Sequence, residues 1–167
     1  MPEPAHSKHD AHLGLVSRLR QQADDVRHIV SGLDESALAK RTVPDKWSLK
    51  ELVCHLHRVQ QVFEGRLDAM LNQENPPIAR YDPEGDQEFE RMTSRPAAEA
   101  LARFLEDRQR LAQRLEKLPA AEWHRPGRHP EFAHFDVHFQ IEYMGHHEAH
   151  HIYQMFQRRV PLGKLPH

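Results

Sequence analysis

The sequence is poor in several features that would point to particular classes of protein. It holds one cysteine, so no disulfide can form within the chain, and a single thiol fits a reducing compartment. No apolar run approaches the length of a membrane span, and the first ten residues lack the apolar core of a secretory signal. The net charge of -2 gives no electrostatic case for nucleic acid. We therefore expect a cytoplasmic protein with neither a membrane nor a nucleic-acid partner.

Strand patterns and repeats are also missing, whereas helical periodicity is strong. Apolar residues recur at spacings of three and four in four long segments, which predicts one all-α domain over residues 1–167. The expected helices cover residues 10–33, 47–71, 94–118 and 136–159. The long connection at 72–95 allows the third helix to start at the same end as the second, and it contains a predicted short helix at 87–92. Flexible tails are expected at 1–9 and 160–167.

The second expected helix begins at a capping signal and carries two histidines. Ser48 followed by Glu51 forms a capping box. The apolar stripe places His55 on the flank of the core-facing side, His57 on the polar side, and Cys54 away from the core. An outward thiol without a positioned base is not an activated nucleophile. This helix alone favours an ordinary boundary histidine at position 55. The arginines and glutamates of the third helix are expected to form a solvated face.

Histidine is plentiful, with 15 residues, and four of them fall in one stretch of the last expected helix. Residues four apart lie on the same face of a helix, so His147 pairs with His151, and His146 with His150. The apolar stripe turns the first pair inward and the second pair toward solvent. Inward imidazoles cost free energy unless they are bonded. They either bind a metal ion together or are half-buried histidines bonded to carbonyls or carboxylates.

The segment from His147 to His151 also fits the H-E-x-x-H pattern of zinc proteases. No aspartate or glutamate follows Glu148 to act as a third ligand. The glycine and histidine that extend the motif in one protease group are missing as well. The sequence therefore argues against a protease.

Three groups of residues together resemble the DinB-like (damage-inducible) family. The first is Trp47-Ser48, followed by Glu51-Leu52 and His55-Leu56. The other two are Trp123-x-Arg125-Pro126-Gly127-x-His129-Pro130 and His147-Glu148-x-x-His151-x-x-Gln154. Each motif is short, but their order and separation resemble the family from the first expected helix to the fourth. The resemblance implies a four-helix bundle with long crossover connections, in an up-down-down-up arrangement.

The resemblance also implies a metal site and names its ligands. Carried over position by position, the ligands of a divalent metal ion, zinc or nickel, are His55, His147 and His151. The helical periodicity had already turned the last two inward. Three imidazoles suit several metals, so the sequence does not select one.

Four further residues are candidates for the surroundings of this site. Metal-bound histidines need acceptors for their free ring nitrogens, and Glu51 and Glu148 are available carboxylates, with solvent-facing charge as the alternative. His134 and His138, near the start of the last helix, are candidates to line the entrance. No catalytic residue beyond these is identified.

Three functions are compatible with such a site. Family members include thiol S-transferases, so the leading hypothesis is metal-dependent transfer of a low-molecular-weight thiol to an electrophile. The alternative is metal-dependent hydrolysis of a small substrate. A third reading is a non-catalytic, metal-binding stress-response protein. The resemblance also implies a homodimer.

Overall fold

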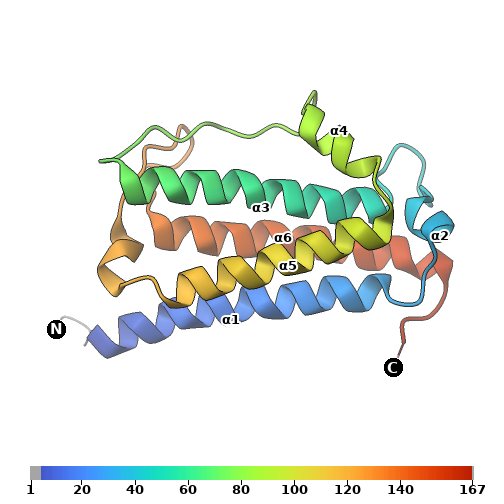
Figure 1. Cartoon of the computed structure of the whole chain (residues 1–167), viewed down its shortest axis with the longest axis horizontal. Coiled ribbons are helices and arrows are strands. Elements are labelled where there is room, and N and C mark those ends of the chain that lie inside the picture. The colour runs from blue at the N-terminus through green and yellow to red at the C-terminus, as the bar shows by residue number, and fades with distance from the viewer. Residues whose placement is uncertain (1–4, 167) are drawn as a thin grey trace.

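The computed structural model describes residues 5–166, with side chains from residue 11 onward. Its helices are α1 (Ala5–Val30), α2 (Glu35–Ala39), α3 (Leu49–Asn72), α4 (Gln87–Thr93), α5 (Ala97–Glu116), η1 (Ala120–His124), α6 (Val137–Arg159) and η2 (Val160–Leu162). The four long helices lie side by side as a bundle, and no strand forms within the described range (Figure 1). The predicted all-α class and four-helix bundle are confirmed.

The chain direction in the bundle is up-down-down-up. Helices α1 and α6 run one way, and α3 and α5 run the other way (Figure 1). Since α3 and α5 are parallel, the segment between them returns along the bundle and carries α4, the predicted short helix, at its far end. Helix α1 packs on α5 and α6, and α3 packs on the same two helices. This arrangement brings α3 against α6 over most of their length.

Helix starts follow the expected local chemistry. The Ser48 hydroxyl accepts a hydrogen bond from the backbone N–H of Glu51, whose carboxylate accepts one from the N–H of Ser48, so the predicted capping box is present. Asp136 caps α6 by accepting from the N–H of Phe139 at 2.7 Å. These caps fix where α3 and α6 begin and therefore the register of their histidines.

The buried face of α3 is wider than its apolar stripe indicates. Cys54 was expected to face outward, yet it is fully buried against Phe89 and Met92. His57 was assigned to the polar side, yet it is 4% exposed, and its Nε2 atom lies 2.5 Å from Oδ2 of Asp107. Both predictions were wrong because α4 and α5 cover a second side of α3 that a single-stripe count treats as solvent.

A buried ion pair links α5 to α6. Arg108, predicted to lie on a solvated face, is 1% exposed and forms a two-pronged pair with Glu148, with Nη1–Oε1 and Nη2–Oε2 distances of 2.7 and 2.5 Å. Its Nε atom donates to Oε1 of Gln60, and Nη1 donates to the carbonyl of Leu19. These contacts give the guanidinium of Arg108 an opposite charge and hydrogen-bond acceptors. Burying its charge therefore costs less free energy than burial without partners would.

The ends of the chain differ in part from expectation. Helix α1 begins at Ala5 rather than Asp10, and residues 1–4 of the predicted tail lie outside the described residues, as does His167. The first three residues of the predicted C-terminal tail form η2. Within residues 5–166, no helix has the length and apolar character needed to cross a membrane.

Candidate metal centre

Three histidine side chains meet between α3 and α6. His55 comes from α3, and His147 and His151 come from consecutive turns of α6. The Nε2 atom of His151 lies 3.2 Å from Nε2 of His55 and 3.1 Å from Nε2 of His147. In the described part of the chain, this is the one group of three or more potential ligands whose donor atoms converge, all within 4.8 Å of one another. We call these residues the histidine triad.

The spacing and protonation of the triad suit a shared metal ion. Two imidazole nitrogens bound to one tetrahedral zinc at about 2.0–2.1 Å lie about 3.4 Å apart, close to the observed separations. The Nδ1 atom of His151 is 2.8 Å from Oε1 of Gln154, so this nitrogen carries the proton and Nε2 offers a lone pair. The triad could therefore hold a metal ion.

Burial keeps the triad neutral, which is the state that binds metal. Burial, with a smaller contribution from the neighbouring His151 and His147, lowers the pKa of His55 to about 3. Burial likewise lowers the pKa of His147 to about 4. The pKa of His151 is also lowered by burial, and the hydrogen bond to Gln154 opposes that effect. Near neutral pH, few protons have to leave before a cation can bind.

Aromatic rings from two other segments pack against His55. The ring of Trp47 lies 4.7 Å from that of His55, and Phe89 of α4 meets it edge-on at 6.2 Å. His55 is 4% exposed, and its buried Nδ1 atom has no hydrogen-bond partner among the described residues. The ring is therefore fixed by packing, with its Nε2 atom directed at the two histidines of α6.

The triad forms one wall of a cavity of about 340 Å³. The cavity extends along α3 past Phe63 to Arg66, and it is also lined by Tyr143 of α6 and by His129 of the connection before α6. Arg66 was missed at the sequence level. It lies eleven residues after His55, about three helical turns, which puts both on the same face of α3. A charged residue within an apolar stripe is the signal that could have identified it.

The two predicted carboxylates do not contact the triad. Glu51 belongs to the capping box of α3 and forms a two-pronged ion pair with Arg41, with Nε–Oε1 and Nη2–Oε2 distances of 2.9 and 2.7 Å. Glu148 is buried in the pair with Arg108 and is not solvent-facing. The acceptor beside the triad is the amide oxygen of Gln154.

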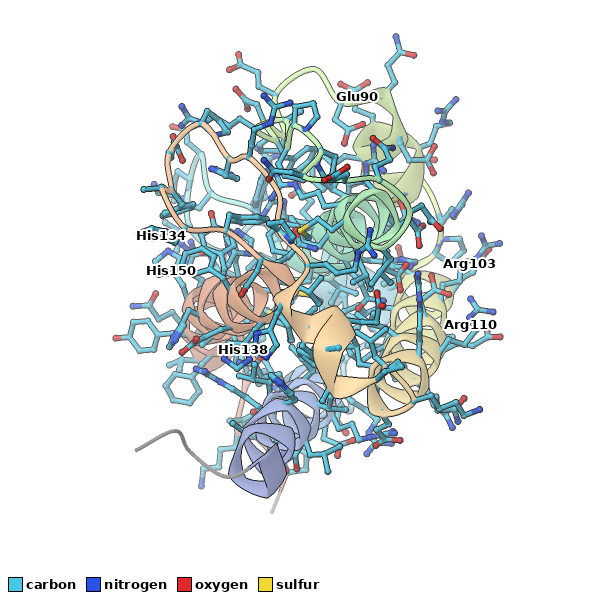
Figure 2. The ribbon with its side chains drawn as sticks, turned by 90° about the vertical axis from the view of Figure 1, so that its left-hand side faces the viewer. Glu90, Arg103, Arg110, His134, His138 and His150 are labelled. Carbon is cyan, nitrogen blue, oxygen red and sulfur yellow. The ribbon has the colours of Figure 1, made fainter. Side chains whose placement is uncertain are left out.

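The two predicted entrance histidines lie elsewhere. Exposed His134 and half-buried His138 lie near the N-terminal end of α6 (Figure 2). They line a separate hollow, and His138 Nδ1 is 2.9 Å from Nδ1 of His12 on α1. The cavity of the triad is bordered instead by His129 and Glu131. His146 and His150 are exposed, as predicted for the outer pair.

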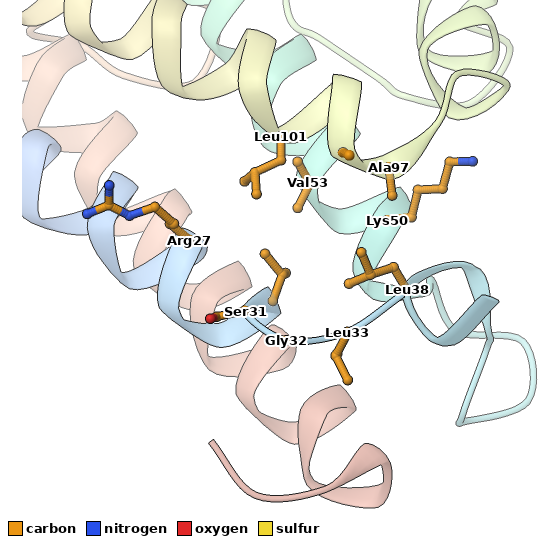
Figure 3. A pocket seen from close by; sticks show the side chains of 11 residues that line it. Arg27, Ser31, Gly32, Leu33, Leu38, Lys50, Val53, Ala97 and Leu101 are labelled. Atoms are coloured by element: carbon orange, nitrogen blue, oxygen red, sulfur yellow. The ribbon is translucent and has the colours of Figure 1, made fainter. Parts of the chain in front are cut away.

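A further hollow, of about 260 Å³, lies between the end of α1, α2 and the first turns of α3 and α5 (Figure 3). Its lining is mostly apolar, with Leu33, Leu38, Val53 and Leu101 around it. Lys50 at its edge donates to Glu35 at 2.7 Å. It lacks the converging donor atoms of the triad, so we do not assign chemistry to it.

Comparison with known proteins identifies a family and related solved structures. The model of the DinB superfamily matches residues 18–155. The structure superposes on that of YfiT from Bacillus subtilis with a TM-score of 0.77 at 20% sequence identity, covering 90% of this chain and 86% of that one. YfiT is described as "a probable metal-dependent hydrolase with an unusual four-helix bundle topology". Among curated proteins, none matches the chain.

Proposed function

The chain belongs to the DinB superfamily, and on that basis we propose that it is a metal-dependent enzyme that transfers a small thiol to an electrophile. The observation that carries the proposal is the convergence of three Nε2 atoms on the wall of a cavity. Three protein ligands leave at least one position open, which is the arrangement of catalytic rather than structural sites.

In this proposal, His55, His147 and His151 bind a divalent metal ion, zinc or nickel. When bound, the metal supplies a Lewis acid that lowers the pKa of a thiol or a water molecule. Gln154 holds the His151 ring in the required tautomer, and Trp47 and Phe89 fix the ring of His55. The ligands therefore start in the orientation that binding needs.

The other cavity residues favour thiol transfer over hydrolysis. Hydrolysis by a metal-activated water commonly uses a nearby carboxylate as general base. Among the described residues, Glu131 is the one carboxylate that lines the cavity, and it lies 3.2 Å from Arg80 in an ion pair. Glu148 is bonded to Arg108. A thiol ionised by a metal needs no further base, because the thiolate is itself the nucleophile.

Hydrolysis remains the second candidate because YfiT is described in those terms. The two reactions differ in what is consumed. Thiol transfer to an aryl chloride forms a carbon–sulfur bond and releases chloride and one proton, whereas hydrolysis proceeds without any thiol.

The test uses untagged, zinc- or nickel-loaded protein with glutathione, bacillithiol or mycothiol and a chlorinated dinitrobenzene. We expect chloride release that depends on one of the thiols and is lost in His147→Ala. The matched control is His146→Ala, which removes an exposed histidine one residue away and should keep full activity. Hydrolysis of an ester panel without thiol would favour the second candidate. Full metal content with no turnover of either kind would contradict an enzymatic role.

The family resemblance also leads us to propose a homodimer. Light scattering on the purified chain tests this, with about twice the monomer mass expected. A monomer at micromolar concentration would contradict it.

A further inference from the structure

Arg66 is a buried cation at the end of the cavity remote from His55. It is 8% exposed, lies on α3 and lines the same cavity as the triad. Its guanidinium lies over the ring of Phe63 at 4.8 Å, and its Nη2 atom donates to the carbonyl of Ala79 at 2.7 Å. Ala79 belongs to the segment that returns along α3 (Figure 1). The side chain is therefore held in place by a ring and one neutral acceptor.

The charge of Arg66 is not balanced within the described part of the chain. No carboxylate there lies within ion-pair distance of it, and its buried Nε atom has no hydrogen-bond partner. Burial lowers the pKa of Arg66, opposed only by Tyr143. A buried charge without an opposite charge costs free energy. Of the other two buried arginines, Arg108 has Glu148 as its partner, and Arg159 donates to four backbone carbonyls. Arg66 has one carbonyl acceptor and a buried Nε atom without a partner, so the contrast points to a missing acceptor, which the uncompensated charge favours as an anion.

Two further hydrogen-bond donors, His129 and Arg80, line the cavity with Arg66, and the one carboxylate among its described lining residues, Glu131, is paired with Arg80. The Nδ1 atom of His129 accepts the backbone N–H of Glu131 at 3.1 Å, and burial, together with Arg66, lowers the pKa of this histidine. Its ring is therefore neutral near pH 7 and carries its proton on Nε2.

We propose that Arg66 binds an oxyanionic group, a carboxylate or a phosphate, on the substrate that reaches the triad. The proposal rests on the proposed function, because it takes the triad as the reacting end of the cavity. An arginine fork matches the geometry of carboxylate and phosphate oxygens. The substrate would be an elongated molecule, because the Cα atoms of His55 and Arg66 are about 16 Å apart along α3. The apolar wall at Val59 and Phe63 suits a hydrocarbon or aromatic middle.

The competing explanation is that Arg66 only holds the Ala79 carbonyl in place. A structural role predicts that substitutions change stability but not the preference for an anion. A binding role predicts that the preference itself changes. Binding of simple probes separates the two, without depending on turnover.

The experiment is calorimetric titration of zinc-loaded and zinc-free protein with phenylacetate, phenyl phosphate and neutral phenylacetamide. We expect at least one anion to bind about tenfold more tightly than the amide, the size of a charge-assisted hydrogen bond. Arg66→Gln should remove that preference while leaving amide binding unchanged, and Arg66→Lys should retain part of it. The preference of the two anions relative to each other identifies carboxylate or phosphate as the favoured group.

The matched control is Arg80→Gln, an exposed arginine of the same cavity that is already paired. It should keep most of the preference. Equal binding of anions and amide by the native protein would overturn the proposal even if no Arg66 variant folds. An anion preference that survives in Arg66→Gln but disappears without zinc would also overturn it, because the metal would then be the anion site. These outcomes are separate from metal content and thiol consumption, which test the proposed function.

Discussion

His55 and His57 lie two residues apart on α3, and each is 4% exposed, yet their surroundings differ in kind. His55 faces α6, where its Nε2 atom meets the lone pair of another imidazole. His57 faces the α5 side, where its Nε2 atom meets the carboxylate of Asp107 at 2.5 Å. Burial therefore does not identify a metal ligand. The chemistry of the facing group does, because a carboxylate satisfies an imidazole and two further imidazoles do not.

The largest expected effect is the loss of bound metal when a residue of the histidine triad is replaced. Replacing His55, His147 or His151 by alanine should reduce bound metal from about one ion per chain to less than about a tenth, since two imidazoles hold zinc far more weakly than three. His57→Ala should leave the metal content unchanged. Elemental analysis of untagged proteins measures both. Equal metal loss in His55→Ala and His57→Ala would remove the distinction.

The second prediction concerns the ion pair between α5 and α6. Glu148→Ala leaves the guanidinium of Arg108 buried without its partner, so the free energy of unfolding should fall by about 3–5 kcal/mol. Metal content should remain near one ion, because Glu148 is bonded to Arg108 and not to the triad. Denaturant unfolding together with elemental analysis checks this. Metal loss in a folded Glu148→Ala variant would show that this residue supports the site directly.

His57→Ala is the third case and should affect stability alone. It removes the buried hydrogen bond to Asp107, at a cost of about 1–3 kcal/mol. Denaturant unfolding of the metal-free variant gives the value without a contribution from metal binding. Unchanged stability would mean that the contact with Asp107 contributes nothing.

A fourth prediction uses pH. Burial lowers the pKa of His55 to about 3 and that of His147 to about 4 in the folded chain, whereas an unfolded histidine titrates near 6.5. The unfolded state therefore takes up protons first, so metal-free stability is full above pH 6.5 and falls as the pH drops toward 3. His55→Ala should show a smaller fall between pH 7.5 and 5. Melting temperatures of the native protein and the variant at the two pH values measure this fall. An equal fall in both proteins would contradict the lowered pKa of His55.

The smallest expected effect is at Cys54. Burial raises the pKa of this thiol to about 11, and its side chain is fully covered by α4 and α5. The folded protein should therefore react with a thiol reagent at pH 7 far more slowly than the unfolded protein does, and Cys54→Ala should keep its metal and activity. Fast modification under native conditions would indicate that α4 opens readily.

Much of this architecture was predictable from local patterns. The four helices, the cap at Ser48 and the short helix at 87–92 follow from periodicity and capping, which are properties of neighbouring residues. Even the inward pair His147 and His151 follows from one apolar stripe. The bundle order needed the family resemblance, because nothing local states which helices are parallel.

The residues on the second buried side of a helix could not be predicted from its apolar stripe. A helix in a bundle contacts two neighbours, so the flank that looks polar at Cys54, His57 and Arg108 is covered by another helix whose position the sequence does not give. For the same reason, the cavity could not be predicted from the sequence. Arg66 and His129 lie 63 residues apart in the chain and line one cavity only because the connection before α6 folds over α3.

Anomalous diffraction at the absorption edge of the metal, on crystals of untagged protein loaded with zinc or nickel, tests the central assignment most directly. We predict one strong peak per chain, about 2.0–2.2 Å from the Nε2 atoms of His55, His147 and His151. A peak at other histidines, such as His134 or His138, with none at the triad, would contradict the account.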